Sequence, residues 1–222
     1  MPAQLIPVDE LRARLYDSAT GLLSTDDDAT ELAIGLASDH IERYMNRSFM
    51  AAKHRIVLPP YPGLWSEIFE KWCVFTDQWP VLAVASVSDP KTDDAITDSG
   101  IAPFFMESGW EKLRYLSVPR DKATDSYVVE YWAGYRNMGE TNDETNTRLG
   151  TIDIEYPVLP DLIASSVAQL VQYGFNRTAR DTEGRDNVSH LVSGERVESR
   201  FLRPGTLERS VIRNLQPFRA LT

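Results

Sequence analysis

The longest regular pattern of apolar residues lies between residues 29 and 45. Apolar side chains recur there mostly at spacings of three and four, which predicts an amphipathic helix with one continuous apolar face. These residues are Ala29, Leu32, Ala33, Leu36, Ala37, Ile41, Tyr44 and Met45. The run Ser24–Asp28 precedes them, and a Ser or Thr cap followed by acids satisfies the free N–H groups of a helix start. A shorter helix is predicted over Val8–Tyr16.

Between residues 51 and 135 the helical spacing gives way to short runs rich in β-branched and aromatic residues, separated by turn-forming residues. Ser108-Gly109 marks one hairpin, and the cluster that opens at Pro59 marks another turn. These runs predict a small antiparallel sheet inserted between helices. The predicted strands are Lys53–Leu58, Trp72–Thr76, Pro80–Val87, Phe104–Glu107, Leu113–Val118 and Tyr127–Trp132.

Helical spacing returns in the last third of the chain. Residues 139–155 are polar and acidic and predict a long surface loop. Pro160 opens a second long helix whose apolar face carries Ile163, Val167, Leu170 and Val171. Residues 180–194 are charged and short of apolar side chains, which predicts a linker. A last helix of about three turns is predicted after Pro204-Gly205.

Together these segments predict an α+β chain. Its core is expected to be a helical bundle that carries an inserted small antiparallel β region, followed by an extended C-terminal helical arm. The expected parts are residues 1–50 (N-terminal core helices), 51–135 (β-rich insert), 136–180 (acidic loop and second long core helix) and 181–222 (linker and arm).

Composition narrows the classes of function. Hydrophobic residues at 42% are sufficient for a packed core, and a net charge of −10 argues against a general binder of nucleic acid or anionic membranes. Cys73 is the one cysteine, which excludes an internal disulfide and suits a reducing cytoplasm. The chain has no stretch of 18 apolar residues and no signal-peptide pattern, so we expect no membrane contact.

The sequence carries no recognisable catalytic, phosphate-binding or metal-binding motif. The aspartates at 26–28 lack the alternate spacing of a calcium loop, and His40, His54 and His190 have no zinc-like spacing. We therefore expect a protein that is not an enzyme and that uses no cofactor and no metal. The five tryptophans fall between Trp65 and Trp132; a sugar or base platform is one interpretation, and packing or an interface is the favoured one.

The order of four segments resembles the head–tail connector (adaptor) family of long-tailed bacteriophages. The matching segments are a helix after an acidic turn, a Tyr-x-Ala-Gly-Tyr-like element, a proline-started helix that ends in Asn-Arg, and a Leu-x-Pro-aromatic-Arg ending. They lie at Asp26–Phe49, Tyr131–Tyr135, Pro160–Arg177 and Leu215–Arg219. The chain departs from the family pattern at Tyr61–Lys71 and Gly139–Glu155, which are larger than usual.

The resemblance implies a ring, usually of twelve subunits, in the neck of the virion, assembled in the host cytoplasm. Such a ring sits below the portal protein, extends the channel through which genomic DNA passes without sequence-specific binding, and provides the attachment site for the stopper or tail. The nearest alternative is a head-closing stopper or tail-completion protein. A cell-wall hydrolase and a DNA-packaging protein are further alternatives, and a polar pocket with perturbed carboxylates would favour the hydrolase.

The C-terminal arm is the predicted portal-docking segment. From Arg177 onward nine arginines and no lysine stand against six acids. Arginine and aromatic side chains are typical interface anchors, and a short amphipathic helix needs a surface to pack on. Chance in a small sample is the other explanation of the arginines, and packing of the helix on its own subunit is the alternative to docking. The predicted portal-binding residues are Phe201, Leu202, Arg203, Leu207, Arg209, Val211, Ile212, Arg213, Leu215, Phe218 and Arg219.

Overall fold

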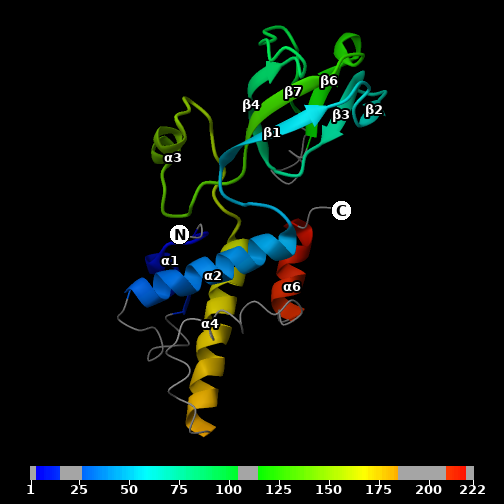
Figure 1. Ribbon diagram of the computed structural model, residues 1–222. Coiled ribbons are helices and arrows are strands. Elements are labelled where there is room, and N and C mark those ends of the chain that lie inside the picture. Colours follow the sequence, from blue (N-terminus) through cyan, green and yellow to red (C-terminus); the bar gives the residue numbers. More distant parts are fainter. Residues whose placement is uncertain (1–3, 16–26, 105–114, 185–208, 219–222) are drawn as a thin grey trace. The chain divides into compact units, whose positions relative to one another are not determined.

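The computed structural model describes residues 4–15, 27–104, 115–184 and 209–218 (Figure 1). The chain divides into two compact units, which are described separately. The helical unit comprises Met1–Arg47, Asn137–Gly139 and Leu159–Thr222, and the β unit comprises Ser48–Arg136 and Glu140–Val158.

The helical unit is built around one central helix. Its described helices are α1 (Val8–Leu15), α2 (Asp27–Met45), α4 (Asp161–Gly184) and α6 (Arg209–Leu215), followed by the 3₁₀ turn η4 (Gln216–Phe218). The helices α1, α2 and α6 all contact α4 (Figure 1). The first half of α4 is accordingly buried on most sides, from Ile163 to Val171. The apolar spacing along α2 and α4 is what allows the two helices to pack.

Arg14 fastens α1 to α4. Its guanidinium donates to Ser165 Oγ at 2.9 Å and to Asp161 Oδ1 at 2.6 Å, and it pairs with Glu10 at 2.8 Å within α1. Several charge-assisted bonds converge on one partly buried side chain, so the planar guanidinium sets the register of the two helices.

His40 lies on the buried side of α2. Burial lowers the pKa of its imidazole, Arg43 adds to that effect, and Asp39 partly opposes it. The folded protein therefore binds this proton less readily than the unfolded chain does, so stability is lost as the pH falls below the ordinary histidine value of about 6.5.

We expect the melting temperature to fall between pH 7 and pH 5, and to fall less in the His40→Gln variant. Thermal melts of both proteins at the two pH values measure this difference. An equal fall in both proteins would show that His40 makes no contribution to the pH dependence.

The β unit contains two antiparallel sheets. One has the strand order β1-β7-β4 and the other the order β2-β3-β6-β5. The pairing of β1 with β7 is regular from Ala52 opposite Ala133 to Leu58 opposite Tyr127. The strands are β1 (Ala52–Leu58), β2 (Leu64–Ser66), β3 (Lys71–Phe75), β4 (Val81–Ser88), β5 (Ala102–Phe104), β6 (Tyr115–Pro119) and β7 (Tyr127–Ala133).

The two sheets share one hydrophobic core. Val129 and Tyr131 of β7, Leu116 and Val118 of β6, and Val74 of β3 belong to a single buried cluster. This core lies entirely within the β unit, because every member of the cluster falls between Leu58 and Ala133. Strand alternation explains it: β-branched and aromatic side chains at every second position point to the same side of a sheet.

The prediction of a helical-bundle core with a small inserted sheet is wrong. The chain is α+β, but only 36% of it is helical, and its described residues form two antiparallel sheets with seven strands. The physical reason is that the strands bury their own cluster of apolar side chains, so they form a unit with an independent core.

Two local predictions are also wrong. The expected loop over residues 139–155 contains the helix α3 (Asn142–Leu149), and the expected linker begins late, because α4 continues to Gly184. The strand β2 was not predicted. The strands predicted over Phe104–Glu107 and Leu113–Val118 lie partly in residues 105–114, outside the described residues.

Candidate functional site

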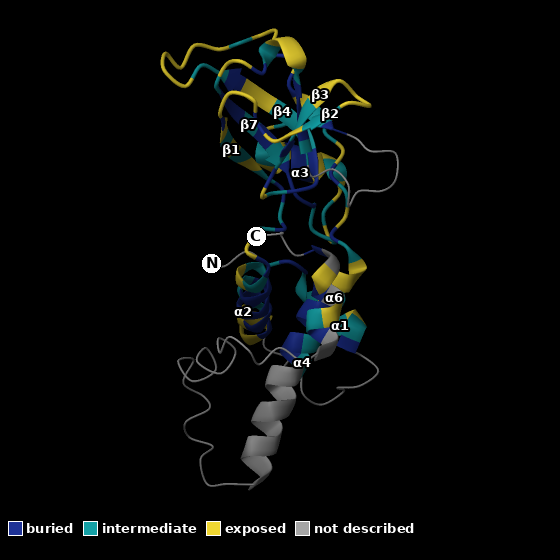
Figure 2. Cartoon of the chain, turned by 90° about the vertical axis from the view of Figure 1, so that its right-hand side faces the viewer, coloured by how far each residue is buried: buried dark blue, intermediate teal, exposed yellow. Residues whose placement is uncertain are grey.

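Large apolar side chains are exposed around β2 and the turn that follows it. Leu64 is 76% exposed, Ile68 86%, Tyr61 58% and Phe69 44%. Figure 2 shows exposed segments, in yellow, beside β2 and β3. Together with Trp65 and Trp72, these four residues are called the hairpin surface below.

Aromatic contacts hold the hairpin surface in place. Tyr61 and Trp65 each pack against Trp72, with ring centroids 5.7 Å and 5.6 Å apart. The guanidinium of Arg120 lies over the Trp65 ring, 5.7 Å from its centroid. Rigid aromatic side chains with an arginine beside them are typical of protein–protein contacts, because they bury a large area and lose little side-chain entropy.

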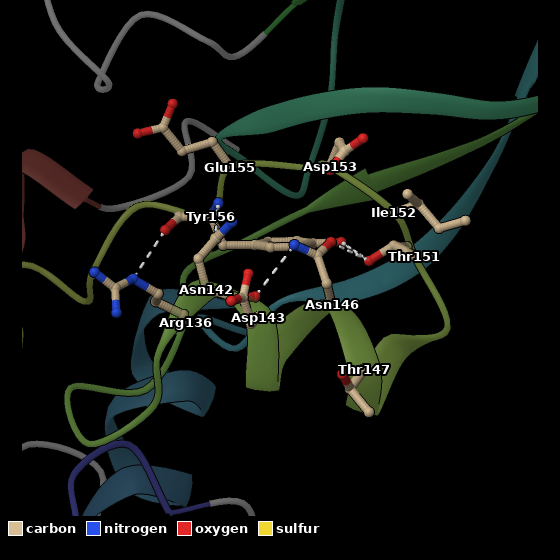
Figure 3. Close-up of a pocket in the computed structure, with 10 residues that line it drawn as sticks. All are labelled: Arg136, Asn142, Asp143, Asn146, Thr147, Thr151, Ile152, Asp153, Glu155 and Tyr156. Carbon is tan, nitrogen blue, oxygen red and sulfur yellow. Dashed lines mark hydrogen bonds between the residues drawn. The ribbon is translucent and has the colours of Figure 1, made fainter.

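A hollow of about 600 Å³ lies between α3 and the segment that follows it. Figure 3 shows the side chains that line it, which come from Arg136, from α3 and from residues 151–156. Three carboxylates stand around it, those of Asp143, Asp153 and Glu155. Ile152 lines it as well and is 85% exposed.

Amide side chains of α3 fix the walls of this hollow. The side-chain amides of Asn142 and Asn146 both donate to the carbonyl oxygen of Ile154 at 2.9 Å. The Tyr156 N–H donates to Asn142 Oδ1 at 2.8 Å, and the Thr151 hydroxyl donates to Asn146 Oδ1 at 2.6 Å. Residues 151–156 lack regular secondary structure and are nevertheless held in one position.

Strong start and stop signals explain why α3 forms at all. Thr141 caps it: the Thr141 hydroxyl accepts from the Glu144 N–H, and the Glu144 carboxylate accepts from the Thr141 N–H. This reciprocal pair lowers the pKa of Glu144, first through the backbone bond. Gly150 ends the helix in the left-handed conformation, with φ 67°.

Two groups that could act as nucleophiles, the Cys73 thiol and the Tyr131 hydroxyl, do not ionise readily. Burial raises the pKa of the Cys73 thiol, although Lys71 opposes this. Burial, with the charge of Asp77, also raises the pKa of Tyr131 to about 12. Both groups are therefore protonated near neutral pH. Within the described residues no group of three or more His, Cys, Asp or Glu side chains is placed to hold a metal ion.

The described residues of the predicted portal-docking arm lie in the helical unit. Val211, Leu215 and Phe218 are buried, Ile212 is half-buried and Arg213 is exposed. Helix α6 contacts α4, so its apolar stripe is covered by the same chain. Arg209 begins α6, but its side chain is not described. Outside the described residues lie Phe201, Leu202, Arg203, Leu207 and Arg219. Portal binding by these residues stays a prediction.

The hairpin surface and the hollow were not predicted from the sequence. The capping box Thr141–Glu144 and the Gly150 stop were visible signals for α3, which forms one wall of the hollow. Nothing comparable marked the hairpin surface, because exposure of an apolar residue depends on the packing around it.

No protein-family model and no curated protein matches this sequence. Among the described helices, none is both long and apolar enough to cross a membrane.

Proposed function

We propose that the protein is a structural head–tail connector (adaptor) of a tailed phage. It forms a ring below the portal, extends the DNA channel and gives the stopper or tail a place to attach. The hairpin surface is the observation that carries this proposal. The order of the sequence segments supports the class of partner.

The hairpin surface needs a protein partner on physical grounds. Four large apolar side chains lie close to one another in the sequence; Leu64, Ile68 and Tyr61 are more than half exposed to water, and Phe69 is 44% exposed. Contiguous exposed apolar surface of this kind marks interaction sites in soluble proteins. The aromatic contacts hold its tryptophans in fixed positions, so these side chains lose little conformational entropy when a partner binds.

The acidic charge of the chain fits the proposed channel. A net charge of −10 disfavours tight pairing with DNA phosphates. A ring of such subunits lets DNA slide past without holding it.

The purified protein is expected to assemble into rings of about twelve copies and to join portal-bearing heads. Mass photometry measures the copy number, and electron microscopy of heads mixed with the protein locates it next to the portal. A protein that stays monomeric at all concentrations and leaves heads unbound would contradict the proposal. Location at the far end of the neck, away from the portal, would instead identify a stopper or tail-completion protein.

The Ile68→Asp variant is expected to keep its fold and its ring but to lose attachment of the next neck protein. Ile68 is 86% exposed, so the change costs the isolated subunit within about 0.5 kcal/mol. A charge in the centre of an apolar contact weakens binding by about tenfold or more. The measurement is the yield of tailed particles when variant rings are added to heads and tails.

Leu32→Asp is the matched control, since Leu32 is 52% exposed on α2 and lies outside the hairpin surface. An equal yield of tailed particles with Ile68→Asp and with the unaltered protein would exclude the hairpin surface as the attachment site.

A further inference from the structure

A strip of basic and apolar side chains runs along the exposed face of β1. Lys53, Arg55 and Val57 are two residues apart, so they project to one side of the strand at a spacing of about 7 Å. All three are exposed, Val57 to 60%. Strand β1 is at the edge of its sheet, and among the described strands it pairs with β7 alone. These three residues are called the basic strip.

Arg55 is the cation of the strip that is most available. Lys53 bonds to Glu130 of β7 at 2.9 Å, and this bond is the first cause of the lowered Glu130 pKa. In the part of the chain that the structure describes, Arg55 forms no ion pair, although Glu130 lies opposite it across the strand pair.

A segment with the opposite chemistry lies along the hollow. Ile152, Asp153 and Glu155 are exposed, and the bonds from Asn142 and Asn146 to Ile154 hold this segment on α3. Figure 3 shows the side chains of Asp153 and Glu155 on the side of the segment away from α3. Neither carboxylate forms an ion pair with a described residue. Ile152, Asp153 and Glu155 are called the acidic segment.

The order of chemistry along the two surfaces is complementary. Along the basic strip, Lys53 and Arg55 are cations and Val57 is apolar. Along the acidic segment, in the reverse direction of the chain, Glu155 and Asp153 are acids and Ile152 is apolar. Antiparallel contact therefore sets Lys53 against Glu155, Arg55 against Asp153, and Val57 against Ile152.

We propose that the basic strip of one copy docks on the acidic segment of a second copy. The inference deepens the proposed function by naming the contact that closes the ring, and it rests on that proposal. Two different surfaces of the same chain meet, and repetition of such a head-to-tail contact generates a ring when the rotation closes.

Charge explains why this pair of surfaces suits a second copy. The chain carries −10, so two copies repel each other over most of their surface. The basic strip concentrates positive charge where another acidic copy can approach. Opposite charges at both faces also favour the correct register of docking.

Charge reversal tests the proposal in the full-length chain. We expect Lys53→Glu and Glu155→Lys, which reverse the two members of one facing pair, each to raise the concentration needed for half-assembly by about tenfold or more, because each sets like charges against one another. Asp153 stays unaltered, since its backbone φ of 56° suits few other residues. Mass photometry and sedimentation velocity measure assembly, and thermal melts confirm that each variant is folded.

Mixing the two variants is the decisive experiment. Each is defective alone, but in an alternating ring the two kinds of contact both regain opposite charges. At one contact the strip altered by Lys53→Glu meets the segment altered by Glu155→Lys, and at the next contact an unaltered strip meets an unaltered segment. We expect the mixture to regain assembly to within about threefold of the unaltered protein. Lys91→Glu and Asp98→Lys are matched controls, since they change the charge equally at exposed positions outside both surfaces.

The possible results separate the two proposals. If the unaltered protein forms rings and the reversals have no more effect than the controls, the docking surfaces are wrong and the connector proposal stands. If both reversals weaken assembly and the mixture does not recover, the strip and the segment do not face each other and the inference is overturned. If the unaltered protein forms no ring even with portal-bearing heads, both proposals fail.

Discussion

Leu215→Ala is expected to lower the free energy of unfolding of the helical unit by about 3 kcal/mol. Leu215 is fully buried, and α6 contacts α4. The substitution removes apolar contacts and leaves a cavity that the neighbouring side chains fill only in part. Helix α6 has seven residues and is too short to persist without packing, so losing this contact also loosens the helix. Denaturation followed by helical circular dichroism measures the change.

Arg213→Ala is the matched control for Leu215→Ala. Arg213 is exposed on the same helix, so its replacement is expected to change stability by about 0.5 kcal/mol or less. The comparison also bears on portal docking. If the apolar stripe serves a portal groove, Leu215→Ala leaves the stability of the free subunit unaltered and weakens binding to heads.

Regular apolar spacing made some elements predictable from the sequence. The helix predicted from Ala29 to Met45 is α2, and the strand predicted over Tyr127–Trp132 is β7 with one residue added. In β7 the local pattern and the tertiary burial agree, since Val129 is fully buried. In α2 they agree in part: Ile41 and Met45 of the predicted apolar face are fully buried, but Leu32 of that face is 52% exposed. Such agreement is why periodicity is informative for long amphipathic segments.

Division into two units could not be read from the same pattern. Apolar alternation shows that a strand has a buried side but not which element covers it. The β strands could have packed on the helices or on one another. They pack on one another, since Val74 of β3 and Val129 of β7 share one cluster. Long-range pairing decides this, and it leaves little trace in local sequence.

Helix α3 was missed because it has little apolar surface. Its sequence, Asn142–Leu149, ends in its one aliphatic residue, so neither helical nor strand periodicity marks it. Capping and side-chain hydrogen bonds hold it instead. The hollow beside α3 and the acidic segment could therefore not be predicted from the sequence either, since their geometry depends on those hydrogen bonds.

Gly134→Ala is expected to destabilise the β unit by about 3 kcal/mol or more. Gly134 follows β7 with φ 110°, a conformation that side chains disfavour. An added Cβ would lie 2.7 Å from the carbonyl oxygen of Met50 and 2.9 Å from the Cα of Ala51. This backbone has little freedom to move away, because the Ala51 N–H donates to the Tyr135 carbonyl at 2.8 Å and the Tyr135 N–H donates to the Phe49 carbonyl at 2.8 Å.

Gly150→Ala separates the clash at Gly134 from backbone strain alone. Gly150 has φ 67°, and an added Cβ there meets no atom within 4 Å, so only the strain of about 1 kcal/mol is expected. All five tryptophans belong to the β unit, so urea denaturation followed by tryptophan fluorescence reports on this unit in both variants. Equal losses of stability would mean that the chain near Met50 yields to the added methyl group, and that the close approach of the two backbone segments does not require a glycine.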